Sequence, residues 1–293
     1  MRIAFFRHFF ITAFLIMLLT MMLFQAPCVI QGAHTGLELW YEAVLPSILP
    51  FMIITTLLLQ QSTGRFICFL GLLCGLPIGA NLVNIQFTQQ LWTKRQANIL
   101  LCICNITSPM FIMGYVLHHT LRNQIAVLPF LLSVYLPVFL YFLVFLLVSA
   151  FENKKHLSPK STSALPLSFD QIVHQSLQVI LTIGITIMLF CIGIQFLLKI
   201  IPPSNIILRT IISGLEITNG IHLITAFPIS LKQKTALIAG LTSFGGICSI
   251  LQTKHVITSH ELSVFHYSLI KLCMGLSSYL LVHLFYITHL FAE

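Results

Sequence analysis

Two long stretches without a charged residue constrain this chain more than any other feature. Neither 128–151 nor 177–198 contains Asp, Glu, Lys or Arg. As a helix, each stretch is long enough to cross the roughly 30 Å hydrocarbon core of a bilayer. Hydrophobic residues make up 57% of the 293 positions and charged residues only 8%, against about 25% charged residues in ordinary soluble domains. The sequence therefore predicts an integral membrane protein whose main partner is the lipid bilayer.

The alternation of apolar runs with polar residues predicts an all-α, polytopic architecture of about seven transmembrane helices. The expected crossings are about 9–30, 39–60, 97–117, 125–150, 173–198, 235–257 and 263–289. Two further apolar segments, 66–87 and 206–228, carry Gly, Pro and polar residues at their centres. These two are expected to form re-entrant hairpins or broken helices.

The N-terminal segment has the form of a signal peptide, because Arg2 and Arg7 precede its apolar run. Gln25-Ala26-Pro27-Cys28 makes a poor lipobox and no good cleavage site follows it, so an uncleaved signal-anchor helix over 1–35 is favoured. More Lys and Arg residues flank the crossings on the cytoplasmic side when the N-terminus is placed there, and Lys271 falls within a crossing. We therefore expect a multi-pass cell-membrane protein with a cytoplasmic N-terminus.

A polar segment at 152–168 divides the chain into halves, 36–151 and 169–293, that share an order of parts. Each half has a crossing, an interrupted segment, a crossing broken by polar residues or glycines, and a plain crossing. Since each half contains three full crossings, the second must insert upside down, with 152–168 as a cytoplasmic linker. This is the arrangement of an inverted-repeat transporter.

The four interruptions, two in each half, are the candidate functional region. They lie at Gly75–Asn81, Asn105–Pro109, Gly214–Gly220 and Thr242–Gly246. Inside hydrocarbon a helix is broken only where protein or a water-filled cavity satisfies the freed backbone groups. The breaks therefore predict a shared polar cavity, where N–H groups at helix N-termini suit an anion and freed carbonyls suit a cation.

Glu216 is the most informative single residue, because it lies in an apolar segment beside Thr218 and Asn219. A carboxylate at membrane depth costs at least about 2.5 kcal/mol and usually marks an ion or substrate path. Its functional interpretation is a proton- or cation-coupling group, or a group that contacts the substrate. The structural alternative is an interfacial Glu at a hairpin mouth, paired with Arg209 or Lys234.

Uncharged donors and acceptors near the breaks complete the predicted substrate site. Besides Glu216, the candidates are Asn81, Asn105, Thr107, Ser108, Thr218, Asn219, Ser243, Gly245 and Gln252, together with Gly79. The alternative role of the polar ones is to cap broken helix ends. Gly71, Gly75 and Gly79, spaced by four, favour close helix packing over ligand approach.

Other functions find no support in the sequence. The basic residues are scattered without a contiguous stripe, which argues against nucleic acid. The eight cysteines lie mostly within apolar runs, as small packing residues do. No His-Glu-x-x-His, P-loop or nucleophile-elbow motif is present, so we expect no metal site, no cofactor and no enzymatic activity. Glu38 and Glu42, with Trp40 and Tyr41, are typical of an interfacial helix end.

At these breaks the chain resembles the sporulation integral membrane family called YlbJ, within the Gate or nucleoside-recognition group. The resemblance runs from about Gly36 to Leu281. It begins with Leu39-Trp40 and is carried by five motifs in order: Leu45-Pro46-Ser47-Ile48-Leu49-Pro50-Phe51, Gly75-Leu76-Pro77-Ile78-Gly79-Ala80, Asn105-Ile106-Thr107-Ser108-Pro109-Met110-Phe111-Ile112, Gly214-Leu215-Glu216-Ile217-Thr218-Asn219-Gly220 and Phe244-Gly245-Gly246-Ile247-Cys248. Similar proteins often carry a basic residue where Asn81 stands and a second Asn where Ile106 stands.

The resemblance implies a role in spore formation, with movement of dipicolinic acid across the outer forespore membrane. The leading hypothesis is thus a transporter or facilitator of a small polar, anionic metabolite. The alternative is a non-transporting membrane scaffold for sporulation or envelope remodelling, and an intramembrane enzyme is disfavoured. The sequence leaves open the substrate, any coupling ion and whether the chain forms a homo-oligomer.

Overall fold

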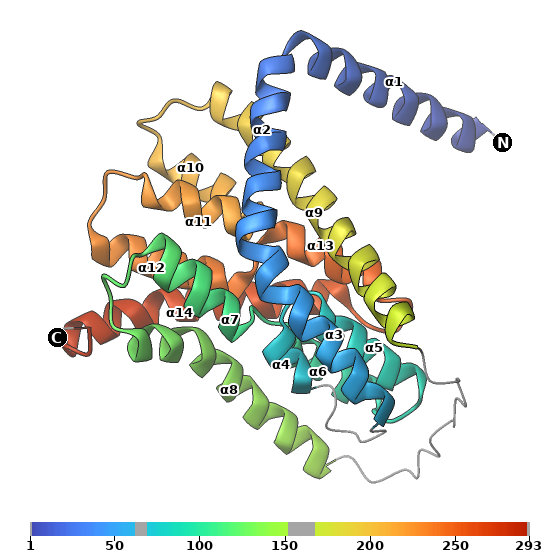
Figure 1. Ribbon diagram of the computed structural model, residues 1–293, viewed down its shortest axis with the longest axis vertical. Coiled ribbons are helices and arrows are strands. Elements are labelled where there is room, and N and C mark those ends of the chain that lie inside the picture. Colours follow the sequence, from blue (N-terminus) through green and yellow to red (C-terminus); the bar gives the residue numbers. More distant parts are fainter. Residues whose placement is uncertain (1, 62–68, 152–167, 292–293) are drawn as a thin grey trace.

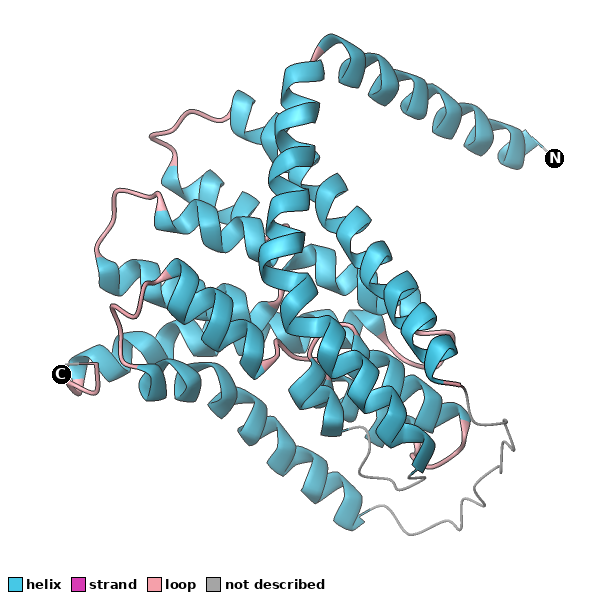
Figure 2. Ribbon diagram, in the orientation of Figure 1, coloured by secondary structure: helices cyan, strands magenta, loops and turns pink. Residues whose placement is uncertain are grey.

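The computed structural model of the protein describes residues 2–61, 69–151 and 168–291, and within these ranges the chain is helical without strands (Figures 1 and 2). The expected linker at 152–168 lies almost wholly outside them. The elements are α1 Arg2–Phe24, α2 Ala26–Leu39, the π-helix η1 Trp40–Val44, α3 Leu45–Gln61, α4 Gly71–Cys74, α5 Ile78–Thr88, α6 Lys94–Cys104, α7 Pro109–Phe111, the π-helix η3 Ile112–Thr120, α8 Val127–Phe151, α9 Phe169–Ile200, α10 Ile206–Ser213, α11 Ile217–Thr225, α12 Leu231–Phe244, α13 Gly246–Val256 and α14 Val264–Ile287.

Six helical runs within the described residues are long and apolar enough to cross a membrane. They are Ala26–Leu58, Lys94–Thr120, Val127–Phe151, Phe169–Ile200, Leu231–Val256 and Val264–Ile287. This confirms the predicted all-α polytopic class. The last five runs coincide with five of the expected crossings, and the expected interrupted segments are broken into α4 with α5 and α10 with α11.

The first two expected crossings have different boundaries in the structure. The apolar stretch 9–30 is divided at Gln25, where α1 ends and α2 begins. Pro27 lies in the first turn of α2, where a missing N–H costs nothing. From there α2, η1 and α3 continue as one run, Ala26–Leu58, so the polar residues between the two expected crossings are helical. Figure 1 shows α1 leaving the end of α2 and pointing away from the other helices.

Helices α2 and α9 cross closely because α2 carries Gly32 and Gly36 on one face. A Cβ on Gly32 would lie 2.6 Å from the Cα of Ile192, and one on Gly36 would lie 2.6 Å from the Cα of Met188. Both distances are far shorter than an ordinary contact, so only glycine allows this approach. The crossing joins a helix near the start of the chain to the first helix of the second half.

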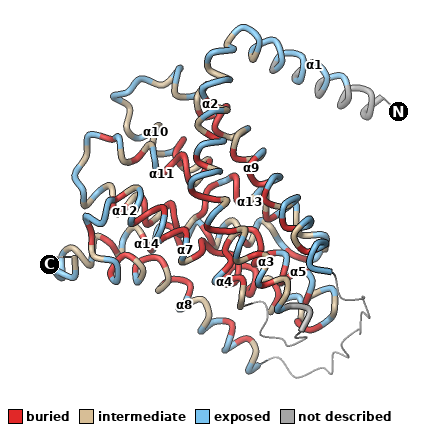
Figure 3. The backbone as a smooth tube through the Cα atoms, in the orientation of Figure 1, coloured by how far each residue is buried: buried red, intermediate tan, exposed pale blue. Residues whose placement is uncertain are grey.

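Polarity is distributed inside out relative to a water-soluble protein. Large apolar side chains such as Leu147, Ile185 and Leu280 are 56–64% exposed on the outer faces of α8, α9 and α14. Polar side chains such as Asn105 and Glu216 are instead almost completely buried. Figure 3 shows buried positions gathered at the centre, where α4, α7, α11 and α13 meet. This is the distribution expected when hydrocarbon is the solvent.

Candidate functional site

One small cavity lies where the four helix interruptions meet. Its volume is about 50 Å³, which is room for a few water molecules at about 10 to 15 Å³ each. Every interruption contributes to its wall or borders it, and the lining residues are Val44, Ile48, Gly75, Leu76, Thr107, Ser108, Phe111, Ile183, Ile187, Glu216, Ile217, Thr218, Cys248, Ser249 and Gln252. The breaks predicted from the sequence therefore converge, and the shared cavity is lined by apolar as well as polar side chains.

In the first half, side chains of the second break cap the freed helix ends. The backbone N–H of Ala80, in the first turn of α5, donates to Oδ1 of Asn105 at 3.2 Å. Ser108 is the N-cap of α7, and its Oγ accepts from the N–H of Phe111 at 3.2 Å. These are the donors that a helix start leaves without an intrahelical partner.

In the second half, the two breaks satisfy each other through the backbone. The N–H groups of Ile247 and Cys248, at the start of α13, donate to the carbonyls of Gly214 and Leu215 at 3.0 and 2.8 Å. Gly246, which precedes them, has φ +81° and Gly245 has φ +87°, a left-handed conformation that suits glycine. These two N–H groups, which the sequence analysis offered to an anion, are therefore occupied by protein in this conformation.

Glu216 is the N-cap of α11 and is 1% exposed. Its carboxylate accepts from the backbone N–H groups of Thr218 and Asn219 at 3.1 and 2.7 Å, and from Oγ1 of Thr218 at 2.6 Å. The alternative of an interfacial Glu paired with a base is not what the described residues show. Lys234 donates instead to the carbonyl of Thr225 at 2.6 Å, and the ion pairs found in the described residues are surface His–Glu pairs. Within the part of the chain that the structure describes, the carboxyl group in the cavity has no paired cation.

Asn105 is fully buried but does not line the cavity. Besides accepting from Ala80, its Nδ2 donates to Oγ1 of Thr253 at 2.8 Å and to the hydroxyl of Tyr267 at 2.9 Å. Asn219 is buried too, and its Nδ2 donates to Sγ of Cys191 at 3.2 Å. Both side chains hold helices together beside the cavity.

The remaining predicted site residues divide into two groups. Thr107, Ser108, Thr218 and Gln252 line the cavity with Glu216. Asn81 is exposed, and Gly79 packs so tightly that a Cβ would lie 1.9 Å from the carbonyl oxygen of Cys104. Ser243 is buried without a hydrogen-bond partner among the described residues, and Gly245 ends α12 against Ser249.

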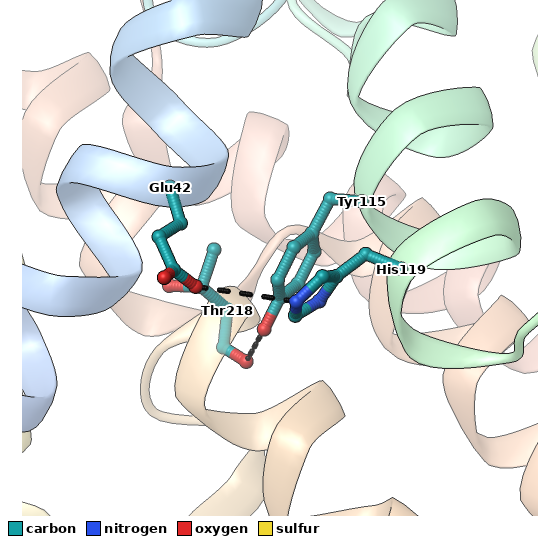
Figure 4. A network of polar contacts seen from close by, with 4 residues as sticks. All are labelled: Glu42, Tyr115, His119 and Thr218. Atoms are coloured by element: carbon teal, nitrogen blue, oxygen red, sulfur yellow. Dashed lines mark hydrogen bonds and ion pairs between the residues drawn. The ribbon is translucent and has the colours of Figure 1, made fainter.

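Tyr115, which the sequence analysis did not single out, joins the cavity wall to the surface (Figure 4). Its hydroxyl donates to the carbonyl of Thr218 at 3.0 Å, and its ring stacks on that of His119 with centroids 5.6 Å apart. Nε2 of His119 lies 4.0 Å from Oε2 of Glu42, and both of these side chains are more than half exposed. Glu42 lies in η1, whereas Tyr115 and His119 lie in η3. Nothing in the sequence indicates that these segments form π-helical turns.

Lys271 is a second residue that gains importance from the structure. The sequence places it within a crossing, and the structure buries it completely in α14. Its Nζ has no hydrogen-bond partner among the described residues, and it does not line the cavity. In the same described residues no group of three or more His, Cys, Asp or Glu side chains is placed to hold a metal ion.

Comparison with known proteins gives one relative for this architecture. The chain is 23% identical over 307 aligned residues to the sporulation integral membrane protein YlbJ of Bacillus subtilis (strain 168), covering 84% of this chain and 74% of that protein. The chain is a distant relative of YlbJ. The YlbJ resemblance carried by the motifs at the breaks is thereby confirmed. No family model matches the chain, and no solved structure gives a significant match.

Proposed function

We propose that this YlbJ relative moves a small polar, anionic metabolite across the membrane, and that the carboxyl group of Glu216 couples the movement to a proton. The observation that carries the proposal is the convergence of four helix interruptions on one cavity with a buried carboxyl group. Helix breaks at membrane depth are found where protein or a water-filled cavity satisfies the freed backbone groups, and transporters commonly build their substrate sites from such breaks. The relation to YlbJ makes dipicolinate the first substrate to test, and nucleosides the second.

Charge explains why a proton belongs in the proposal. An anion beside ionised Glu216 is repelled, since two unit charges about 4 Å apart interact by about 4 kcal/mol at an effective dielectric constant of 20. Among the described residues, no cationic side chain lines the cavity to offset this repulsion. Protonation of Glu216 removes it, so anion and proton enter the site together.

The cavity volume requires a conformational change during transport. A volume of about 50 Å³ is well below the roughly 300 Å³ or more of sites that enclose metabolites. In the proposed cycle the halves 36–151 and 169–293 act as inverted repeats that rock about the breaks and open the site to one side at a time. The described conformation then corresponds to a closed stage of this cycle.

The test is uptake by liposomes that contain the purified protein. Dipicolinate, and nucleosides in parallel, are supplied outside with and without an inward proton gradient. We expect the gradient to speed dipicolinate uptake. Glu216→Gln keeps an oxygen that caps α11 but has no titratable proton, so its uptake is expected to lose the response to the gradient. Glu261→Gln removes an exposed carboxylate between α13 and α14 and serves as the matched control.

The non-transporting scaffold remains the second candidate, because one observation favours it. Helix ends at the breaks are satisfied within the protein, as the bonds from Ala80 to Asn105 and from Cys248 to Leu215 show. Absence of uptake of dipicolinate and nucleosides by well-folded protein would refute transport and favour the scaffold. A gradient response that Glu216→Gln retains would refute the coupling role of that residue alone.

A further inference from the structure

A groove lined by both polar and apolar side chains runs along the outside of the protein between α9 and α13. Its volume is about 590 Å³, and its walls are formed by Pro77, Gln175, Gln178, Val179, Thr182, Ile183, Thr186, Leu251, Gln252, His255 and Val256. The groove therefore lies along the first half of α9 and the last turns of α13.

The α9 wall of this groove includes a stripe of polar side chains along the helix. Gln175, Gln178, Thr182 and Thr186 are three or four residues apart, so they share one face of the helix. The threonine hydroxyls donate to the carbonyls one turn earlier, at 2.9 and 2.7 Å. The glutamine side chains are exposed, and an amide in hydrocarbon without a partner costs at least about 2 kcal/mol. Water in the groove removes this cost.

The groove ends at the Glu216 cavity, because the two spaces share a wall. Ile183 on α9 and Gln252 on α13 line both of them. Nε2 of Gln252 donates to Sγ of Cys248 one turn earlier, at 3.4 Å, and this bond draws the side chain toward the cavity. The side chains of Ile183 and Gln252 thus lie between a groove large enough for a metabolite and a cavity with room for only a few waters.

We propose that the groove is a water-filled access path and the first binding site of the transported solute, and that Gln252 and Ile183 form the partition between it and the Glu216 cavity. This inference rests on the proposed transport function and adds the route by which the solute reaches the Glu216 cavity. The chemistry fits a small hydrogen-bonding solute, with amides and hydroxyls along the path. His255, in the last turn of α13, adds a ring with nitrogen donor and acceptor groups to the wall.

The first test measures whether water reaches the groove. Thr182→Cys and Leu181→Cys are compared in a background with Cys28, Cys68 and Cys273 changed to serine; the other native cysteines are all buried. Both positions are exposed on α9, but only Thr182 lines the groove. A membrane-impermeant methanethiosulfonate is expected to modify Thr182→Cys about tenfold faster, because it reacts with the thiolate, which water stabilises and hydrocarbon does not.

Three results would overturn the inference. Equal rates at the two positions show that lipid, not water, fills the groove. A slow reaction at Thr182→Cys in membranes that becomes fast in dilute detergent shows that a second copy of the chain covers it. If a solute that the protein transports fails to slow modification of Thr182→Cys, the groove is not its binding site; dipicolinate and nucleosides are the probes, with about a twofold slowing expected at half occupancy.

The labelling experiment and the uptake experiment can fail independently of each other, so the groove proposal and the transport proposal are tested separately. Water access to Thr182→Cys requires no uptake, and uptake requires no particular route. A Gln252→Leu variant adds a test of the partition. It replaces the amide by an apolar side chain of similar size and is expected to lower uptake while leaving the labelling rate of Thr182→Cys unchanged. Unchanged uptake in this variant removes Gln252 from the proposed route.

Discussion

Gly79→Ala tests whether the breaks depend on the backbone contact seen between α5 and α6. A Cβ at position 79 would lie 1.9 Å from the carbonyl oxygen of Cys104 and 2.9 Å from the Cα of Asn105. Because the obstacle is backbone, α5 must shift away from α6. The same shift lengthens the 3.2 Å hydrogen bond from the N–H of Ala80 to Asn105.

The expected loss of stability follows from three terms. Overpacking of a close contact costs about 1 to 3 kcal/mol, and the weakened buried hydrogen bond adds about 1 kcal/mol. Alanine regains about 1 kcal/mol through its higher helix propensity. The net loss for Gly79→Ala is therefore about 1 to 3 kcal/mol, and the very short contact places it near the upper limit. In a chain of this size such a loss lowers the melting temperature by roughly 2 to 5 °C.

The assay is thermal unfolding of the purified protein in detergent, followed by a fluorogenic thiol dye. The chain suits this readout because Cys74, Cys102, Cys104, Cys191 and Cys248 are at most 2% exposed when folded and react only on unfolding. Gly193→Ala is the matched control, since a Cβ at that position of α9 meets nothing within 4 Å. We expect the control to melt at or slightly above the temperature of the parent protein. If Gly79→Ala melts as high as Gly193→Ala, the contact between α5 and α6 is not as close as described.

Two further pairs of variants probe the same region. Asn105→Ala removes the acceptor of the Ala80 N–H and the donor to the hydroxyls of Thr253 and Tyr267, of which Tyr267 keeps its bond to the backbone carbonyl of residue 105. This variant is expected to cost about 2 to 4 kcal/mol, whereas Asn81→Ala, at an exposed position, should stay within about 0.5 kcal/mol. Similar melting temperatures for the two variants would contradict the assigned hydrogen bonds. At the fourth break, Gly245 has φ +87°, so Gly245→Ala is expected to cost about 1 to 2 kcal/mol and Gly245→Asn less. If the Gly245→Ala variant is more stable than the Gly245→Asn variant, the result argues against the left-handed turn.

Local sequence signals predicted which segments cross and where they break. Hydropathy located the crossings, because desolvation of each segment is a local property that neighbouring helices hardly change. The breaks could be predicted for the same reason, because Gly75, Pro109 and Gly245 disfavour a continuing helix wherever they occur. The predicted motif residues Ser108 and Glu216 indeed begin helices, as N-caps of α7 and α11.

Local signals were less informative about the beginning of the chain. The expected crossings 9–30 and 39–60 left residues 31–38, which include Gly32 and Gly36, as the connection between them. In the structure they lie within α2, because α9 packs against their bare backbone and makes a continuous helix favourable. Helix α9 is more than a hundred positions away in the sequence, so no window around Gly32 contains this information.

By itself, the sequence determined that the protein lies in a lipid bilayer, that it is helical, and at which four places helices break. Each of these follows from the chemistry of neighbouring residues. The tertiary structure alone decided which polar residues share a site. In the structure Thr107, Ser108, Thr218 and Gln252 line one cavity with Glu216. Asn105 and Gly79 lie instead at contacts between helices. The physical reason is that a side chain's role depends on which distant helix lies within about 4 Å of it, and only the folded chain sets that distance.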